Sequence, residues 1–327
     1  MQDPIVSICC ITFNQRKYLS QMLEGVSKQV VSFPTEIVIH DDASTDGSIS
    51  VLQEYEREHP NVTLLLEEEN QFSRGNLPLT LSWPSLRGKY IAFCEGDDFW
   101  IDSEKLQRQI DLLEQNPTCS ACFHPAKIIE ENGCDTNSLI GSIQNFGCEI
   151  IRGTDILRSI FNTRNPVAQL SGLMVRRSAL DLDSMRQLES ILGVEDMPLQ
   201  MLVASQGDFI YLPQAMSCYR WMSQGSWSEK HQNTHHAEKW RENSCVCFEK
   251  FDKMTNSRWK SDICEAVLQI QYESCLANND RKGMLLPKFK SIFIKEPLST
   301  KILTVVGAYC PCGEKVCMWL RKRKRTS

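Results

Sequence analysis

The sequence has no run of about 18 consecutive apolar residues, and this absence predicts that no helix spans a membrane. Its first residues, 1–5, carry no basic segment ahead of an apolar run, so we expect no secretory signal. No repeat of fixed period occurs, which argues against a repeat architecture. No glycine-rich segment follows the first predicted strand, and this excludes the usual phosphate-binding loop at that position.

The composition is that of an ordinary globular protein, with 42% apolar and 24% charged residues among 327. The net charge is −5, but the run 321–325 contributes +5, so the other residues sum to −10. An acidic body argues against nucleic-acid binding, whereas a basic tail suits an anionic membrane surface. Fifteen cysteines, an odd number without an export signal, favour reduced and mostly buried thiols in a cytoplasmic protein.

The hydrophobic pattern of the first 118 residues predicts strands that alternate with helices. The predicted strands are 5–11, 36–40, 62–66 and 90–94, and the predicted helices are 17–28, 48–58 and 106–113. This alternation is typical of βαβ units, so we expect an α/β fold with a mostly parallel sheet. Residues 119–230 are less regular, with a helix over 154–161. A boundary near residue 230 is expected to separate them from a largely helical extension, 231–327.

Polar residues follow three of the predicted strands where each strand ends. These endings are Thr12-Phe13-Asn14, Asp41-Asp42 and Glu95-Gly96-Asp97-Asp98. Ligands of open α/β sheets bind at the carboxyl ends of strands, so we expect one acidic pocket with an aromatic floor. Several facing carboxylates repel each other unless a cation lies among them, and oxygen ligands suit Mg²⁺ or Mn²⁺ together with substrate phosphates. The alternative is that Asp42, Ser44 and Asp46 only cap the next helix.

The segments 6–14, 41–46 and 95–100, taken in this order, resemble the inverting glycosyltransferase family 2. The resemblance extends from about residue 4 to residue 228. It implies the GT-A fold, a Rossmann-like, mostly parallel sheet flanked by helices. It also implies a nucleotide-sugar donor and a divalent metal, Mg²⁺ or Mn²⁺. The donor can be a UDP-, GDP- or dTDP-sugar, because the residues do not determine the base.

The resemblance also implies roles for donor-site residues. Thr12, Phe13 and Asn14 would line the nucleobase side, Asp41 and Asp42 would hydrogen-bond the base, and Ser44 belongs to the same motif. Asp97 and Asp98 resemble the metal-and-ribose motif, with Asp98 holding the metal. Glu95 stands where many relatives have Asp, which weakens its case as a direct ligand. Arg74 lies in a segment that resembles the donor-contacting stretch.

The segment 193–199 resembles the Glu-Asp motif of the family, at the start of a helix on the acceptor side. Displacement with inversion needs a carboxylate that takes the proton of the acceptor hydroxyl. The resemblance assigns this role to Asp196, with Glu195 supporting it or oriented towards the acceptor. The alternative is a helix N-terminus enriched in acids, which the helix dipole favours.

The segment 218–228 resembles the Tyr-Arg-x-His loop of the family, with Met222 at the histidine position. A thioether is a poor ligand for a hard cation, so metal dependence is less secure than donor binding. Arg220 would bind phosphate, and Trp221 would act as a lid or a sugar platform.

We therefore expect an inverting transfer of a sugar to a hydroxyl of a glycan or lipid-linked acceptor, in polysaccharide, lipid-linked glycan or surface glycan synthesis. A non-catalytic nucleotide-sugar-binding or membrane-assembly subunit is the alternative, and a sugar nucleotidyltransferase is disfavoured by the missing phosphate loop. Apolar residues within 302–320 precede the basic run 321–325. This order is typical of a peripheral membrane anchor, which we would expect at the inner face of the plasma membrane. The alternative is a charged terminus that is only solvated.

Overall fold

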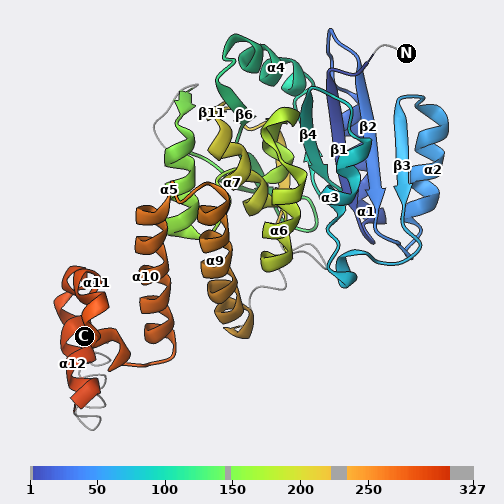
Figure 1. Ribbon diagram of the computed structural model, residues 1–327. Helices are drawn as coiled ribbons and strands as arrows, with labels where there is room; N and C mark the ends of the chain where they lie inside the picture. Colours follow the sequence, from blue (N-terminus) through green and yellow to red (C-terminus); the bar gives the residue numbers. More distant parts are fainter. Residues whose placement is uncertain (1–2, 144–148, 222–233, 310–327) are drawn as a thin grey trace. The chain divides into compact units, whose positions relative to one another are not determined.

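The computed structural model describes residues 3–143, 149–221 and 234–309 (Figure 1). The chain divides into two compact units, Met1–Asn233 and Thr234–Ser327. The first unit contains two β-sheets and the helices that cover them, and the second unit is helical.

Eight strands form the main sheet of the first unit, in the order β3-β2-β1-β4-β10-β6-β11-β9. Their bounds are β1 (Val6–Thr12), β2 (Thr35–Asp41), β3 (Val62–Leu66), β4 (Tyr90–Glu95), β6 (Cys119–Phe123), β9 (Glu149–Ile151), β10 (Leu173–Arg176) and β11 (Asp208–Tyr211). The four strands β3, β2, β1 and β4 are parallel, whereas β10 is antiparallel to both β4 and β6. The predicted mostly parallel α/β sheet is confirmed.

The first four strands lie close to their predicted positions because each contains a run of apolar residues, and β1, β2 and β4 are almost entirely buried. In β1 six of the seven residues are buried, as expected for a parallel strand covered on both sides. The strand β3 has its predicted bounds, and β2 and β4 each extend one residue further, to Asp41 and Glu95.

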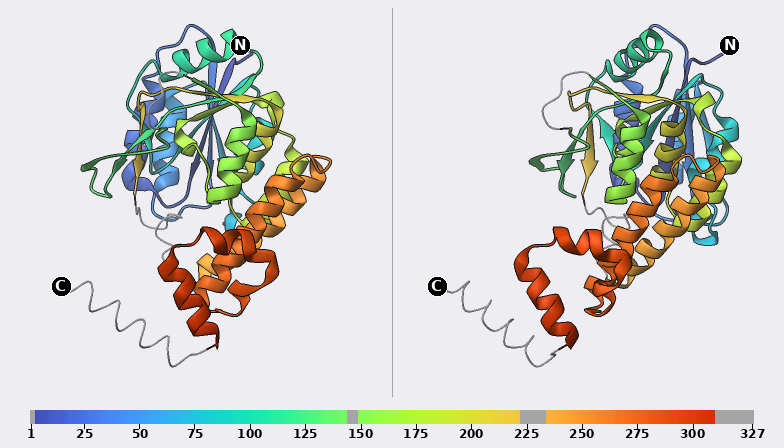
Figure 2. Two further views of the ribbon diagram at one scale, coloured as in Figure 1. Left: turned by 90° about the vertical axis from the view of Figure 1, so that its left-hand side faces the viewer. Right: turned by 60° about the vertical axis from the view of Figure 1, so that its left-hand side comes forward.

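Helices cover both faces of the main sheet (Figure 2). They are α1 (Arg16–Ser27), α2 (Ser48–Glu58), α3 (Pro78–Ser82), α4 (Lys105–Gln115), α5 (Gly153–Thr163), α6 (Leu182–Leu192) and α7 (Asp196–Gln206), with short 3₁₀ turns η1 (Phe72–Arg74), η2 (Trp83–Ser85), η3 (Leu170–Gly172) and η4 (Arg177–Ala179). In α1 the residues Leu19, Met22 and Val26 recur at helical spacing, and they share one core cluster with Ile8 and Cys10 of β1.

A second sheet of four short strands combines one strand directly after the acidic motif with three strands from the less regular segment 119–230. Its order is β5 (Phe99–Trp100), β12 (Ser217–Arg220), β7 (Ala126–Ile129) and β8 (Asp135–Ile140). The partner of β5 lies more than 100 residues further along the chain, at Ser217 and Cys218. Short strands with such distant partners carry little local pattern, which is why periodicity did not reveal them.

The second unit consists of α9 (Thr234–Met254), α10 (Lys260–Ala277), η5 (Gly283–Leu285), η6 (Pro287–Phe289), α11 (Lys290–Lys295) and α12 (Leu298–Tyr309). Tyr272, Met284 and Phe289 form its apolar cluster. None of the helices within the described ranges is both long and apolar enough to cross a membrane. The structure describes eleven cysteines, and seven of them are buried.

Candidate active site

A cleft of about 1340 Å³ opens where β1 and β4 end. Its walls are residues 11–17 after β1, part of the 41–46 turn after β2, the loop 70–73, the acidic motif after β4 and the start of α7. Of the predicted site residues, the cleft is lined by Thr12, Phe13, Asn14, Asp42, Asp97, Glu195 and Asp196. Six predicted site residues do not line the cleft and make contacts elsewhere in the protein. They are Asp41, Ser44, Arg74, Asp98, Arg220 and Trp221.

The turns after β1 and β2 hold each other in place through hydrogen bonds. Asn14 adopts a left-handed backbone (φ 52°), which asparagine tolerates better than most residues. Its amide donates to Ser44 Oγ at 2.8 Å, and its Oδ1 accepts from the Thr45 amide at 2.7 Å. Ser44 therefore positions the turn from outside the cleft. The neighbouring Phe13 ring is 45% exposed and lines the cleft.

The capping alternative holds for Asp46. Its Oδ1 accepts from the amide and the hydroxyl of Ser48, the first residue of α2, at 2.9 and 2.6 Å. Its Oδ2 accepts from the amide of Arg16 at 2.9 Å, where α1 begins. One carboxylate thus satisfies backbone donors at the starts of two helices.

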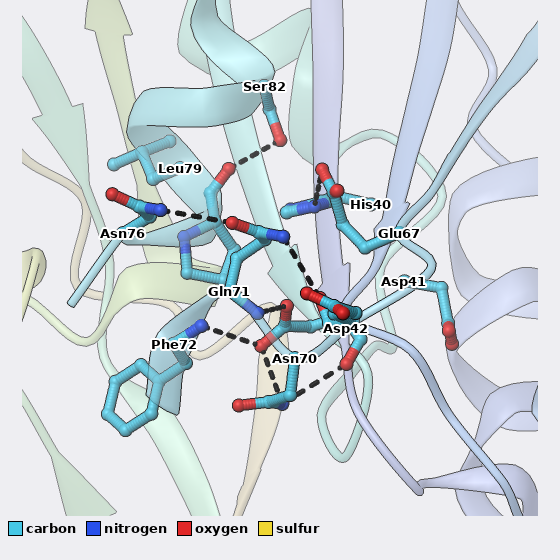
Figure 3. A network of polar contacts seen from close by, with 12 residues as sticks. His40, Asp41, Asp42, Glu67, Asn70, Gln71, Phe72, Asn76, Leu79 and Ser82 are labelled. Carbon is cyan, nitrogen blue, oxygen red and sulfur yellow. Dashed lines mark hydrogen bonds and ion pairs between the residues drawn. The ribbon is translucent and has the colours of Figure 1, made fainter. Parts of the chain in front are cut away.

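Asp42 binds a loop of the protein with both carboxylate oxygens (Figure 3). They accept from the Gln71 amide at 2.6 Å, the Asn70 side chain at 2.8 Å and the Phe72 amide at 3.1 Å. Asp41 points away from this cluster, is fully buried and accepts from the Ser44 amide at 2.8 Å. Burial raises the pKa of Asp41. Both carboxylates, predicted to bind a base, therefore shape the turns around the cleft.

The two adjacent aspartates after β4 have opposite environments. Asp97 lines the cleft, whereas Asp98 is 1% exposed. The Asp98 carboxylate accepts from Gln169 Nε2 at 2.5 Å, Ser171 Oγ at 2.8 Å and the Arg220 amide at 3.0 Å. Burial, and then the charge of Asp97, raises the pKa of Asp98 to about 8. Asp98 therefore lies beneath the motif, held by three hydrogen bonds, and its metal role stays a prediction.

Gln169 and Ser171 hold the acidic motif in place, and no sequence signal marked either residue. Gln169 Nε2 also donates to Glu95 Oε2 at 3.1 Å, and the Glu95 amide donates to Ser171 Oγ at 3.0 Å. Both residues precede β10, whose reversed direction brings its beginning to the edge where β4 ends. A search for polar residues after strands overlooks them for this reason.

Gly96 permits the close approach of the first two strand endings. A Cβ atom at this position would lie 2.4 Å from Gln15 Oε1 and 2.6 Å from Thr12 Oγ1. Thr12 Oγ1 in turn donates to Gln15 Oε1 at 3.1 Å. Only glycine therefore fits between the acidic motif and the turn after β1.

Glu95 and Asp97 are the carboxylates of the motif that line the cleft. Burial, and then the charges of Asp98 and Asp97, raises the pKa of Glu95 well above its usual range. In the part of the chain that the structure describes, no three His, Cys, Asp or Glu side chains form a metal-binding group. Mg²⁺ is commonly held by one or two carboxylates together with substrate phosphates, so this pair fits such an ion.

Glu195 and Asp196 lie at the start of α7 and also line the cleft. Glu195 Oε1 accepts from the Leu79 amide at 2.5 Å, and Glu189 accepts from the hydroxyl of Thr80. Two carboxylates thus fix α3 to α6 and α7. Burial raises the pKa of Glu195 to about 8 and also raises that of Asp196. Asp196 Oδ1 accepts from the adjacent Met197 amide at 2.8 Å.

Arg220 is buried and is not among the residues that line the cleft, so its phosphate-binding role stays a prediction. Its guanidinium donates to Asp97 O at 3.0 Å, Glu131 O at 2.9 Å and Gln21 Oε1 at 2.8 Å. It also lies 4.3 Å from the centre of the Tyr18 ring. The arginine therefore ties the acidic motif to α1 and to the β7–β8 hairpin.

Trp221 and Arg74, which were also predicted to contact the donor, are exposed residues that do not line the cleft. Trp221 is 47% exposed, and its ring lies 6.4 Å from that of Tyr219, edge to face. Arg74 is exposed and forms an ion pair with Glu69, while its neighbour Ser73 lines the cleft. The predicted loop around Met222 falls outside the described residues.

Comparisons with known proteins concern the family and the fold. The family model described as glycosyl transferase family 2 matches residues 7–182. An uncharacterized protein of Mycobacterium tuberculosis, Rv1520, is 31% identical over 223 residues, which cover 68% of this chain and 60% of the relative. A poly(ribitol-phosphate) beta-glucosyltransferase of Bacillus spizizenii is 30% identical over 112 residues, 34% of this chain and 17% of that protein.

Among solved structures, S. aureus TarS 1–349 in complex with UDP-GlcNAc matches with a TM-score of 0.60 at 16% identity. The match covers 93% of this chain and 79% of that one, and it shows a shared fold. The mycobacterial relatives are matched over about 60% of their own length.

Proposed function

Because the chain belongs to glycosyl transferase family 2, we propose that it transfers a sugar from a nucleoside diphosphate sugar to an acceptor hydroxyl. One observation carries the proposal. Carboxylates from two separate elements, Asp97 after β4 and Asp196 at the start of α7, line a single cleft with the exposed Phe13 ring. Its volume of about 1340 Å³ exceeds the roughly 300–1,000 Å³ typical of one small ligand, so a donor and an acceptor group can be bound together.

In this proposal the nucleobase lies against Phe13. An exposed aromatic ring offers a stacking surface, and the hydrogen bonds of Asn14 with Ser44 and Thr45 fix the turn that carries it. The donor is a UDP-, GDP- or dTDP-sugar. Asp42 contributes indirectly, since its carboxylate holds residues 70–72 at the rim of the same cleft.

Glu95 and Asp97 would hold a divalent cation, Mg²⁺ or Mn²⁺, on the diphosphate side of the cleft. Such an ion, when bound, stabilises the negative charge of the departing diphosphate. The metal role that the sequence gave to Asp98 passes to Asp97, because Asp98 is buried and accepts three hydrogen bonds. Asp98 then acts as a positioning residue.

Asp196 is the proposed general base. Its carboxylate takes the proton of the acceptor hydroxyl as that oxygen forms a bond with the anomeric carbon. The bond from this carbon to the diphosphate oxygen breaks on the opposite side, so the configuration inverts. Burial raises the pKa of Asp196 towards the range in which a carboxylate base is most effective. Glu195 positions this base, because its hydrogen bond from the Leu79 amide fixes the start of α7, where Asp196 lies, to α3.

The proposed acceptor is a glycan or a lipid-linked glycan used in polysaccharide or surface-glycan synthesis. The proposed place of reaction is the cytoplasmic side of the plasma membrane. The similarity to a poly(ribitol-phosphate) beta-glucosyltransferase supports an acceptor of this general class.

The test is turnover of a panel of UDP-, GDP- and dTDP-sugars with Mn²⁺ or Mg²⁺, alongside thermal-shift measurements of nucleotide binding. We expect one donor to be consumed, Asp196→Asn to reduce kcat by about 100- to 10,000-fold, and donor binding to persist in that variant. The matched control is Asp183→Asn, an 84% exposed aspartate in the first turn of α6, which leaves kcat unchanged.

Wild-type turnover in Asp196→Asn would remove the base assignment. Nucleotide binding without turnover of any donor, across a range of glycan acceptors, would instead favour the non-catalytic binding subunit.

A further inference from the structure

The exposed face of α12 carries an unbroken apolar stripe. Leu298, Ile302, Val305 and Tyr309 are 72%, 49%, 44% and 77% exposed. Their spacing of four, three and four residues places them within an arc of about 60° on a helix of 3.6 residues per turn. Four large apolar side chains in one row on a surface helix form an interaction surface.

The opposite face of α12 is the one that packs within the second unit. Leu303, Thr304 and Ala308 are buried, and Thr304 Oγ1 lies 4.0 Å from Met284 Sδ. The helix therefore has its own internal packing, and the stripe is not needed to attach it. Ile294 of α11, 59% exposed, adds a further apolar side chain four residues before Leu298.

The part of the sequence that contains this stripe has a large net positive charge. Residues 281–327 contain twelve Lys and Arg against two Glu, a net charge of +10. Residues 1–280 contain 24 basic against 39 acidic side chains, a net charge of −15. Within the described part of this segment, Lys282, Lys290 and Lys295 are exposed. The cationic character is thus a property of the folded α11–α12 region as well as of the basic run 321–325.

We propose that the α12 stripe, with Lys290, Lys295 and Lys301 beside it in the sequence, is a docking surface for an anionic lipid bilayer. Apolar side chains enter the boundary between headgroups and acyl chains, while lysines lie among the anionic headgroups. A second copy of the chain is a weaker occupant. A symmetric pair would bring two such stripes together with their surrounding positive charges, which repel each other.

The experiment is co-sedimentation of the full chain with vesicles of phosphatidylglycerol and phosphatidylcholine, and with pure phosphatidylcholine vesicles. We expect binding to the anionic vesicles that weakens as salt increases. Leu298→Glu should weaken it about tenfold or more, because a carboxylate then replaces a lipid-facing apolar side chain. The matched control is Val246→Glu, at a 53% exposed apolar position of α9, which should bind as wild type.

A second variant tests the charge contribution separately. Lys290→Gln combined with Lys295→Gln should weaken binding to anionic vesicles by roughly fivefold for each charge removed and reduce its dependence on salt. This double change lies at exposed positions and keeps the proposal testable if Leu298→Glu perturbs α12.

Three results would overturn the proposal. The first is that the wild type does not bind anionic vesicles. The second is that both the Leu298→Glu variant and the lysine variant bind them as tightly as wild type. The third is that Leu298→Glu changes the oligomeric state without a change in vesicle binding. The last result would assign the stripe to a second copy. Lipid binding is measured without donor or acceptor, so its failure leaves the sugar-transfer proposal in place.

Discussion

Replacement of Arg220 by methionine separates two roles that the sequence and the structure give this residue. Methionine keeps most of the apolar volume but removes three hydrogen bonds of 2.8–3.0 Å and the contact with the Tyr18 ring. Each hydrogen bond contributes about 1 kcal/mol net, and the cation–π contact contributes a similar amount. We therefore expect the free energy of unfolding to fall by about 4 kcal/mol.

For a unit of this size, 1 kcal/mol corresponds to about 2–4 °C, so the melting temperature should fall by about 8–16 °C. Thermal and urea denaturation followed by circular dichroism measure this change. The control is Arg152→Met, which removes a 71% exposed arginine from its ion pair with Asp155 and should cost less than about 1 kcal/mol.

Nucleotide affinity provides the result that would refute the reasoning. If Arg220→Met unfolds at the wild-type temperature but loses affinity for nucleoside diphosphates, the arginine binds phosphate directly. The hydrogen bonds from Arg220 to the carbonyl oxygens of Asp97 and Glu131 would then contribute little to the stability of the fold.

Three further predictions concern the walls of the cleft. Burial raises the pKa of Glu195 from 4.5 to about 8, so its contribution to stability is present below about pH 4.5 and is lost as the pH rises through 8. Glu195→Gln should accordingly be more stable than wild type at pH 8.5, by about 1–2 kcal/mol, and similar to it at about pH 4.5; equal urea midpoints at both pH values would contradict the assigned burial. Gly96→Ala should cost about 1–3 kcal/mol and weaken nucleotide binding in thermal-shift assays, since its Cβ would lie 2.4 Å from Gln15 Oε1; wild-type stability and affinity would show that the turn after β1 adapts freely. Asp42→Ala removes three hydrogen bonds to residues 70–72, so we expect a loss of about 2–3 kcal/mol and faster proteolysis of that loop; an unchanged cleavage rate would mean that the loop is held by other contacts.

The first four strands and their helices were predictable because their signals are local. Alternating apolar runs and helical spacing over residues 1–118 need no knowledge of distant partners, and α2 has its predicted bounds. The cleft was predictable in outline for a related reason. Parallel strands end at one edge of a sheet, so the residues after β1 and β4 had to meet there.

The different environments of Asp97 and Asp98 could not be predicted from the sequence. Both are acidic and adjacent, and only the tertiary partners distinguish them. The groups that bury Asp98 come from Gln169, Ser171 and Arg220, which lie 71, 73 and 122 residues further along the chain. Motif resemblance identified the segment, but it could not determine which carboxylate faces the cleft.

These long separations have a consequence for how the protein is made. During synthesis, β1–β4 and the whole acidic motif leave the ribosome well before Gln169 and Arg220. Until these residues arrive, Asp98 lacks all three hydrogen-bond donors that accompany its burial, so it must remain solvated and β4 must lack its neighbour β10. Residues 1–118 therefore cannot complete their folding alone. A fragment that ends at residue 118 is expected to expose one edge of β4 and to aggregate, and the cleft is complete only when the start of α7 has been made.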